Sequence, residues 1–141
     1  MLSKRTQYGM RAVLYLAIHS KKSHKIGVNI IAEELQVPKQ FLSKILQELV
    51  KNNLVKSSKG KLGGFYLSPA NKKNSLRQFV EVFDGDDLFC NCMMGLPNCS
   101  SEKPCPLHES AIAFRLELEK TLEDKTINEM AEKINTSGLR I

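Results

Sequence analysis

The amino-acid sequence predicts a mainly α-helical fold with one small β-hairpin and a long helix near the C-terminal end. Three observations predict it: apolar residues recur at three- and four-residue steps over most of the chain, two short helical segments are joined by a tight turn, and a glycine-rich basic segment follows them between two short β-type runs. With 141 residues, of which 42% are hydrophobic, the chain is expected to form one continuous domain with its own core.

The first half of the chain predicts three helices. Residues 6–20 are apolar around most of the helix circumference, which is typical of a helix at the centre of a core. A shorter helix over 30–35, capped by Asn29, is followed by a third helix from Pro38 to about Asn52. The outward face of the third helix carries polar and basic side chains: Lys39, Gln40, Ser43, Lys44 and Gln47.

A β-hairpin is expected directly after the third helix. Residues 54–56 and 65–67 are β-type runs, and the basic segment 57–64 between them contains three glycines. Helix, turn, helix and basic hairpin, in this order, describe a winged helix-turn-helix. The helical pair alone would describe a helical bundle equally well.

The second half predicts helices around one irregular loop. Ser75 caps a short helix, the loop over 90–107 is rich in proline and glycine, and Thr126 with Glu129 forms a capping box for the last helix. Between loop and capping box, residues 109–123 form an amphipathic helix that is long for so small a domain. We expect it to be a C-terminal dimerisation helix that pairs with its copy in a homodimer, rather than one that packs only on its own domain.

The charge is divided between the two halves. Residues 1–78 carry 15 Lys and Arg against three acidic residues, a net charge of +12, whereas residues 79–141 carry 6 against 12, a net charge of −6. A solubilising lysine surface would not require this segregation, so we expect region 1–78 to bind double-stranded DNA and region 79–141 to hold the cysteine loop and the dimerisation helices. The candidate contacts are Lys39, Gln40, Ser43 and Lys44 in the major groove, Lys59 in the minor groove, and Lys4, Arg5 and Lys61 on phosphates.

Several other classes of protein are not expected. No segment approaches the length of a membrane span, and residues 1–18 lack the cleavage site of a signal peptide, so a cytoplasmic protein without a membrane partner is expected. The chain has no glycine-rich nucleotide fingerprint and no acid pair at a catalytic spacing. A Cys105–His108 nucleophile is the one catalytic arrangement to consider, and the proline-rich loop with three neighbouring thiols argues against it. We therefore expect no enzyme.

All four cysteines fall in the loop, as Cys90, Cys92, Cys99 and Cys105, with His108 close behind. In the cytoplasm such a cluster points to metal or redox chemistry. Structural zinc commonly uses a Cys-x2–4-Cys knuckle, which is absent here, and a disulfide switch needs only two thiols. An iron–sulfur cluster suits widely spaced thiolates and leaves room for a histidine ligand. Spacing alone favours the cluster and leaves zinc and a thiol switch open.

Together these segments resemble the iron–sulfur-cluster-binding winged-helix transcriptional regulators, the IscR/NsrR-like family. The resemblance rests on residues 8–12, 31–37, 41–46 and 60–65, and on the pattern Cys92-x6-Cys99-x5-Cys105-x2-His108. It implies a homodimer, expected to act as a repressor on a palindromic operator. Its DNA affinity would be controlled by a 2Fe–2S or 4Fe–4S cluster on Cys92, Cys99 and Cys105, with His108 as the fourth ligand, and aerobically prepared protein can lack that cluster.

Three positions depart from the family pattern. Tyr8 stands where the nitric-oxide-sensing branch has an acidic cluster ligand, and Ser43 stands where the IscR branch has a glutamate that tunes the accepted DNA class. Cys90 is additional, and it is a possible ligand or a spare thiol. The alternative that the residues leave open is a zinc- or thiol-redox-based regulator on the same fold.

Overall fold

Helix α1 (Lys4–His19) lies at the centre of the fold, and helices from both halves of the sequence pack against it. In the computed structural model, which describes residues 1–141, these neighbours are α2 (Val28–Leu35), α3 (Lys39–Lys51), α5 (Leu76–Asp84) and α8 (Ile127–Ser137). Seven residues of α1 are buried, as expected for a helix that is apolar on most sides.

The core is one cluster of 23 buried hydrophobic residues, most of them from α1, α2, α3 and α5. Phe79 of α5, 1% exposed, is the largest of the fully buried side chains. Ile127 and Ala131 of α8 belong to the same cluster, so the last helix packs with the N-terminal helices although the chain between them is acidic. None of the helices combines the length and the apolar character that crossing a membrane requires.

Helices α2 and α3 form the predicted helix-turn-helix. The turn depends on Gln36, which adopts a left-handed conformation (φ 54°) and so ends α2, and on Pro38, which precedes α3. The predicted cap of α2 was wrong. The helix begins after Gly27, whose backbone is extended, and Asn29 lies exposed inside the first turn without a capping hydrogen bond.

The predicted β-hairpin is present, with both strands displaced from their expected positions. β1 (Lys56–Ser58) pairs antiparallel with β2 (Gly64–Tyr66), and the single-turn helix α4 (Pro69–Lys72) follows. Leu54 and Val55, expected in the first strand, are instead buried in the core before the strand begins. The hairpin is the wing of a winged helix.

Two adjacent glycines allow the wing to close. A Cβ atom on Gly63 would lie 2.3 Å from the carbonyl oxygen of Ser58, and one on Gly64, where φ is +149°, would lie 2.8 Å from the backbone of Ile26. Backbone atoms cannot move aside as the end of a side chain can. These positions therefore require glycine for space and, at Gly64, for conformation as well.

We predict that Gly64→Ala destabilises the fold by about 1–3 kcal/mol, because alanine meets both the backbone contact and the unfavourable φ. Urea unfolding monitored by circular dichroism measures the loss, and DNA binding should weaken with it. Gly27→Ala is the control, since Gly27 has a φ of −71° and open space around its Cβ position. Equal stability of the two variants would contradict the prediction.

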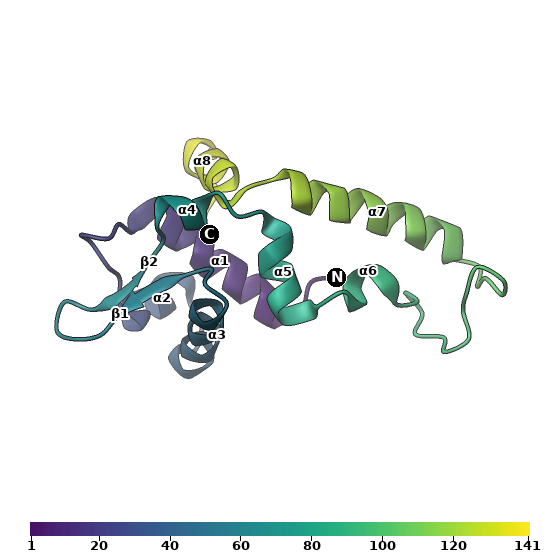
Figure 1. The fold of residues 1–141 in the computed structure, drawn as a ribbon, viewed down its shortest axis with the longest axis horizontal. Coiled ribbons are helices and arrows are strands. Elements are labelled where there is room, and N and C mark those ends of the chain that lie inside the picture. Colours follow the sequence, from purple (N-terminus) through teal and green to yellow (C-terminus); the bar gives the residue numbers. More distant parts are fainter.

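An arm extends from this body. The short helix α6 (Asp87–Cys90) leads into the cysteine loop, residues 91–107, from which α7 (His108–Asp124) returns. Figure 1 shows the cysteine loop at one end of the long axis, on the right, and the wing at the opposite end. The division of charge at residue 78 is thus not a division of packing, because α5 crosses it and α8 rejoins α1.

Arg77 of α5 joins the body to the arm. Its guanidinium lies 2.5 Å from a carboxylate oxygen of Asp86 and 3.4 Å from one of Glu119, and it stacks 4.3 Å from the ring centroid of Phe89. The side chain is 12% exposed. One largely buried cation therefore contacts both helices of the arm, which limits how freely the arm can pivot on the body.

Candidate DNA-binding surface and cysteine site

The outward face of α3 carries the residues predicted to enter the major groove. Lys39, Gln40 and Lys44 are exposed, and Ser43 is half-buried beside them. The face is hollowed rather than flat, and the lining residues are Pro38, Lys39, Gln40, Phe41, Ser43, Lys44 and Gln47. Gln47 was not among the predicted contacts, although its place on the outward face indicated it. Its amide lies 3.5 Å from the Ser43 hydroxyl.

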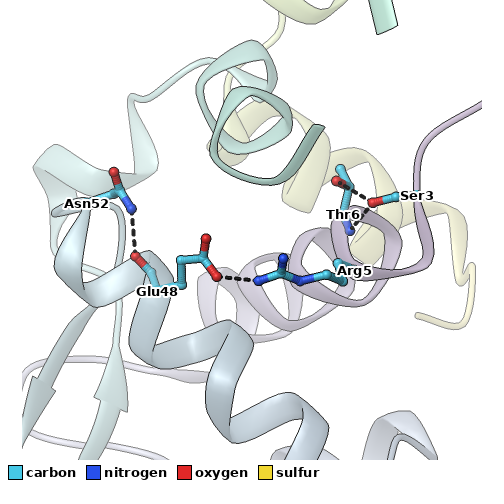
Figure 2. Close-up of polar contacts among 5 residues, drawn as sticks. All are labelled: Ser3, Arg5, Thr6, Glu48 and Asn52. Atoms are coloured by element: carbon cyan, nitrogen blue, oxygen red, sulfur yellow. Dashed lines mark hydrogen bonds and ion pairs between the residues drawn. The ribbon is translucent and has the colours of Figure 1, made fainter. Parts of the chain in front are cut away.

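Contacts with α1 fix the orientation of α3. The ring of Phe41 packs edge-on against Tyr8, with the ring centroids 5.8 Å apart. Figure 2 shows the second contact, in which the Arg5 guanidinium donates to the Glu48 carboxylate near the C-terminal end of α3. Exposed ion pairs contribute only about 0.2–1 kcal/mol to stability. The aromatic contact and the buried face of α3 therefore provide most of the free energy that fixes the orientation of the helix.

Arg5, a predicted phosphate contact, is already engaged within the molecule. Besides the pair with Glu48, its guanidinium lies 5.4 Å from the ring centroid of Phe83. Ser3 caps the start of the same helix by accepting a hydrogen bond from the Thr6 amide, as Figure 2 also shows. An arginine has five N–H donors, so a phosphate can still be reached without release of Glu48.

The remaining predicted DNA contacts lie at the surface. Lys59 and Lys61 are exposed at the tip of the wing, between β1 and β2, and Lys4 is exposed in the first turn of α1. None of these three ammonium groups forms an ion pair with a carboxylate. Each is therefore free to neutralise a phosphate.

The cysteine loop brings three of its thiols together. The sulfur atoms of Cys92, Cys99 and Cys105 all lie within 4.8 Å of one another, and those of Cys92 and Cys105 are 4.0 Å apart. Nδ1 of His108 lies 3.3 Å from the sulfur of Cys99. Cys90 is exposed at the end of α6 and lies outside this group. The long gaps in sequence do not keep the thiols apart, because the loop folds back on itself.

The thiols of Cys92 and Cys99 differ in acidity. Backbone N–H groups of Leu96 and Met94 donate to the sulfur of Cys92 and, with the neighbouring thiols, lower its pKa to about 7. The Cys105 backbone N–H donates to Cys99, but burial and the adjacent thiols Cys105 and Cys92 outweigh it and raise the pKa of Cys99. The arrangement thus stabilises the thiolate at Cys92 relative to the thiolate at Cys99.

We predict that iodoacetamide modifies Cys92 before Cys99 in metal-free, reduced protein, and that the rate at Cys92 rises with pH around a midpoint near 7. The sign follows from the lowered pKa: above the midpoint Cys92 is thiolate, the reactive form, while Cys99 is still a thiol. Peptide mass spectrometry after short exposures at pH 6 to 9 measures both rates. Faster modification of Cys99 at pH 7 would contradict the prediction.

The donor set suits a metal centre. Three thiols and one imidazole are ligands that both a zinc ion and an iron–sulfur cluster accept. In addition, Nε2 of His108 is buried and has no hydrogen-bond partner. A buried polar atom without a partner costs free energy, and a bound metal at the imidazole would remove that cost. The residues therefore fit the group that the sequence pattern implies.

Arg115 of α7 holds the start of the cysteine loop, and sequence reasoning missed it. It is 9% exposed, and its Nη1 donates to the carbonyl oxygen of Asn91 at 2.5 Å while its Nε donates to that of Ala111 at 3.1 Å. Asn91 directly precedes Cys92. The signal available in the sequence was a single arginine on the apolar face of the long helix, in line with Ala111 and Leu122.

The pattern of the family described as Rrf2, iron-dependent transcriptional regulator, matches residues 2–133. The chain belongs to the Rrf2 family. It is therefore a winged-helix, DNA-binding transcriptional regulator and not an enzyme, as the sequence predicted.

Individual relatives agree with this assignment. The regulator NsrR of Oceanobacillus iheyensis is 28% identical over 134 residues, which cover 91% of this chain and 90% of the relative. The solved structure of CymR, named as the global cysteine regulator of B. subtilis, superposes with a TM-score of 0.77 at 20% identity, covering 94% of this chain and 97% of CymR. IscR of T. potens superposes with a TM-score of 0.75 at 21% identity over 99% of this chain and 91% of its own. The two structural likenesses establish the fold.

Proposed function

We propose that this Rrf2-family protein is a cytoplasmic homodimeric repressor whose affinity for a palindromic operator is controlled by an iron–sulfur cluster. Cys92, Cys99 and Cys105 would hold the cluster, with His108 as the fourth ligand. The observation that supports this most is the convergence of three thiols beside an imidazole whose buried Nε2 has no hydrogen-bond partner. When bound, such a cluster supplies a group whose charge and integrity respond to iron supply and oxidants.

The DNA contacts follow from the winged-helix arrangement. Lys39, Gln40, Ser43 and Lys44 would read base edges in the major groove, and Lys59 would enter the adjacent minor groove. Lys4, Arg5 and Lys61 would contact phosphates and fix the register without reading sequence.

We predict that Lys61→Ala weakens binding to all DNA sequences by a similar factor, because a phosphate contact carries no base information. The slope of log Kd against log salt concentration should flatten by about 0.9, the value for one phosphate contact. Fluorescence anisotropy with operator and unrelated duplexes at several salt concentrations measures both effects. A loss confined to the operator would instead place Lys61 on a base edge.

A route of direct contacts connects the cysteine loop with the DNA-binding body. Arg115 fixes the backbone next to Cys92 to α7, and Arg77 fixes α7 and α6 to α5, which packs on α1 and α3. A change in the loop that moves Asn91 therefore acts on α7 first and on α5 next. A coupling of about 1–3 kcal/mol through this route would change DNA affinity five- to 150-fold.

The exposed side of α7 supports the proposed homodimer. Ile112 and Leu116, which lie one helical turn apart on the same face, are 37% and 62% exposed, which leaves apolar side chains in water on a helix whose other side packs on α5 and α6. A second copy lying against α7 would cover them and would present two α3 helices to the two half-sites of a palindrome.

A second candidate is a regulator that senses through thiols or zinc on the same loop. The 4.0 Å between the sulfurs of Cys92 and Cys105 favours it, because a tetrahedral zinc site places its sulfurs about 3.8 Å apart. The same two thiols can form a disulfide if they approach by about 2 Å and an oxidant such as a peroxide accepts the two electrons. Thiol acidity at Cys92 would assist disulfide formation.

Anaerobic purification followed by reconstitution distinguishes the candidates. The cluster proposal expects brown protein that absorbs near 400 nm and contains iron and acid-labile sulfide in stoichiometric amounts. Colourless protein with stoichiometric zinc, or a Cys92–Cys105 disulfide formed without bound metal, would overturn it in favour of the second candidate. Sedimentation of the same sample tests the dimer.

A further inference from the structure

We propose that the chain has a second DNA-backbone contact, behind the wing, which binds phosphates of the duplex that flanks the operator. It consists of Lys21, Lys22, Lys56 and Lys72, called the lysine patch below. The inference takes from the proposed function only that the protein binds duplex DNA. It adds residues that belong neither to α3 nor to the tip of the wing.

The four lysines come from three separate segments that meet at one hollow. Lys21 and Lys22 lie in the turn after α1, Lys56 begins β1, and Lys72 ends α4; Ser23 and Tyr66 line the hollow between them. Figure 1 shows the turn after α1, the sheet and α4 gathered at the end of the molecule farthest from the cysteine loop. The chain thus places four cations on one surface from positions up to 51 residues apart.

The lysine-bearing turn is held firmly. Lys21 and His24 exchange two backbone hydrogen bonds of 3.0 and 2.9 Å, which close the turn on itself. Ile26 exchanges two with Phe65, of 2.9 and 2.8 Å, which attach the end of the turn to β2. The Ser20 hydroxyl accepts from the Leu67 amide at 3.1 Å. The backbone of the patch is therefore ordered in advance, which reduces the entropy that a ligand must offset.

The charge of the patch is not neutralised within the chain. None of its lysines forms an ion pair, and no carboxylate lines the hollow. The three acidic residues of region 1–78, Glu33, Glu34 and Glu48, lie on α2 and α3 instead. Four adjacent ammonium groups repel one another, and this repulsion is relieved when a polyanion binds.

The position of the patch favours DNA over a small anion. No buried polar side chain without a partner points into the hollow, as a built pocket for a free phosphate would require. Lys56 lies three residues before Lys59 at the wing tip, about 10 Å along an extended strand, which corresponds to about three base-pair steps of 3.4 Å. A DNA backbone that leaves the wing tip can therefore continue onto the patch.

The test compares a short and a long duplex. An operator is selected from random-sequence duplexes with the wild-type protein and trimmed to its footprint, and a second version carries about ten added base pairs at each end. The variant K22Q/K56Q/K72Q removes one lysine from each segment. The control K120Q/K125Q/K133Q removes the same charge from exposed lysines of α7, α8 and their connection.

The wild type should bind the long duplex about tenfold more tightly than the short one, and K22Q/K56Q/K72Q should lose that gain while binding the short duplex as before. Its salt slope on the long duplex should flatten by up to about 2.7, or 0.9 for each phosphate that is no longer neutralised. The control should keep the gain. Equal wild-type affinity for both duplexes, or an equal loss in the control, would overturn the inference alone. Failure of the wild type to bind any duplex would overturn the proposed function with it.

Discussion

Replacing Cys99 by alanine is expected to abolish cluster loading and, with it, the control of DNA binding. Cys99 belongs to the group of three thiols and is the one that contacts His108, at 3.3 Å, so the substitution removes one ligand and frees a second. Loaded and cluster-free wild type should differ five- to 150-fold in operator affinity, equivalent to about 1–3 kcal/mol, whereas Cys99→Ala should show one affinity in both preparations.

The measurement is iron and sulfide content together with operator affinity, on anaerobically reconstituted protein. Cys90→Ala is the matched control, because Cys90 is an exposed cysteine at the end of α6, directly before the cysteine loop, and lies outside the group. It should load and respond as the wild type does. If Cys90→Ala lost its cluster while Cys99→Ala kept one, the ligand set would have to be redrawn around Cys90.

Replacing Phe79 by alanine is expected to have the largest effect on stability, a loss of about 3–5 kcal/mol. Phe79 is 1% exposed and lies on α5, which packs on α1, α3 and α7, so no solvent can fill the space it leaves. Domains of this size are stable by only about 5–15 kcal/mol, and the variant should melt roughly 10 °C or more below the wild type.

Leu62→Ala is the control for this prediction. Leu62 lies at the wing tip and is 89% exposed, so its truncation should change the unfolding free energy by no more than about 0.5 kcal/mol. Differential scanning calorimetry and urea unfolding measure both variants. A Phe79→Ala protein that melts with the wild type would show that the core on α5 repacks, and the contact of the arm with the body would then be looser than described.

The sequence by itself determined the elements and their chemistry. The 3.6-residue periodicity located every long helix to within two or three residues, because burial of an apolar face requires that periodicity. The capping box of Thr126 and Glu129 is present at the start of α8, since its hydrogen bonds are local. The wing, the charge division and the Cys92, Cys99, Cys105, His108 pattern were likewise visible, because residue type and short spacing carry them.

Only the tertiary structure decided what depends on distant segments. The return of α8 to α1, the hold of Arg115 on Asn91 and the contacts of Arg77 join residues 9 to more than 100 positions apart. Composition and periodicity carry no information about such pairs. The same holds for the three thiols: the sequence shows that they share a loop, but the folding of that loop decides that their sulfurs lie within 4.8 Å. The spacing of two residues in the sequence gives only the length of chain between them, whereas a set of metal ligands or a patch of charged side chains depends on their distance in the folded protein.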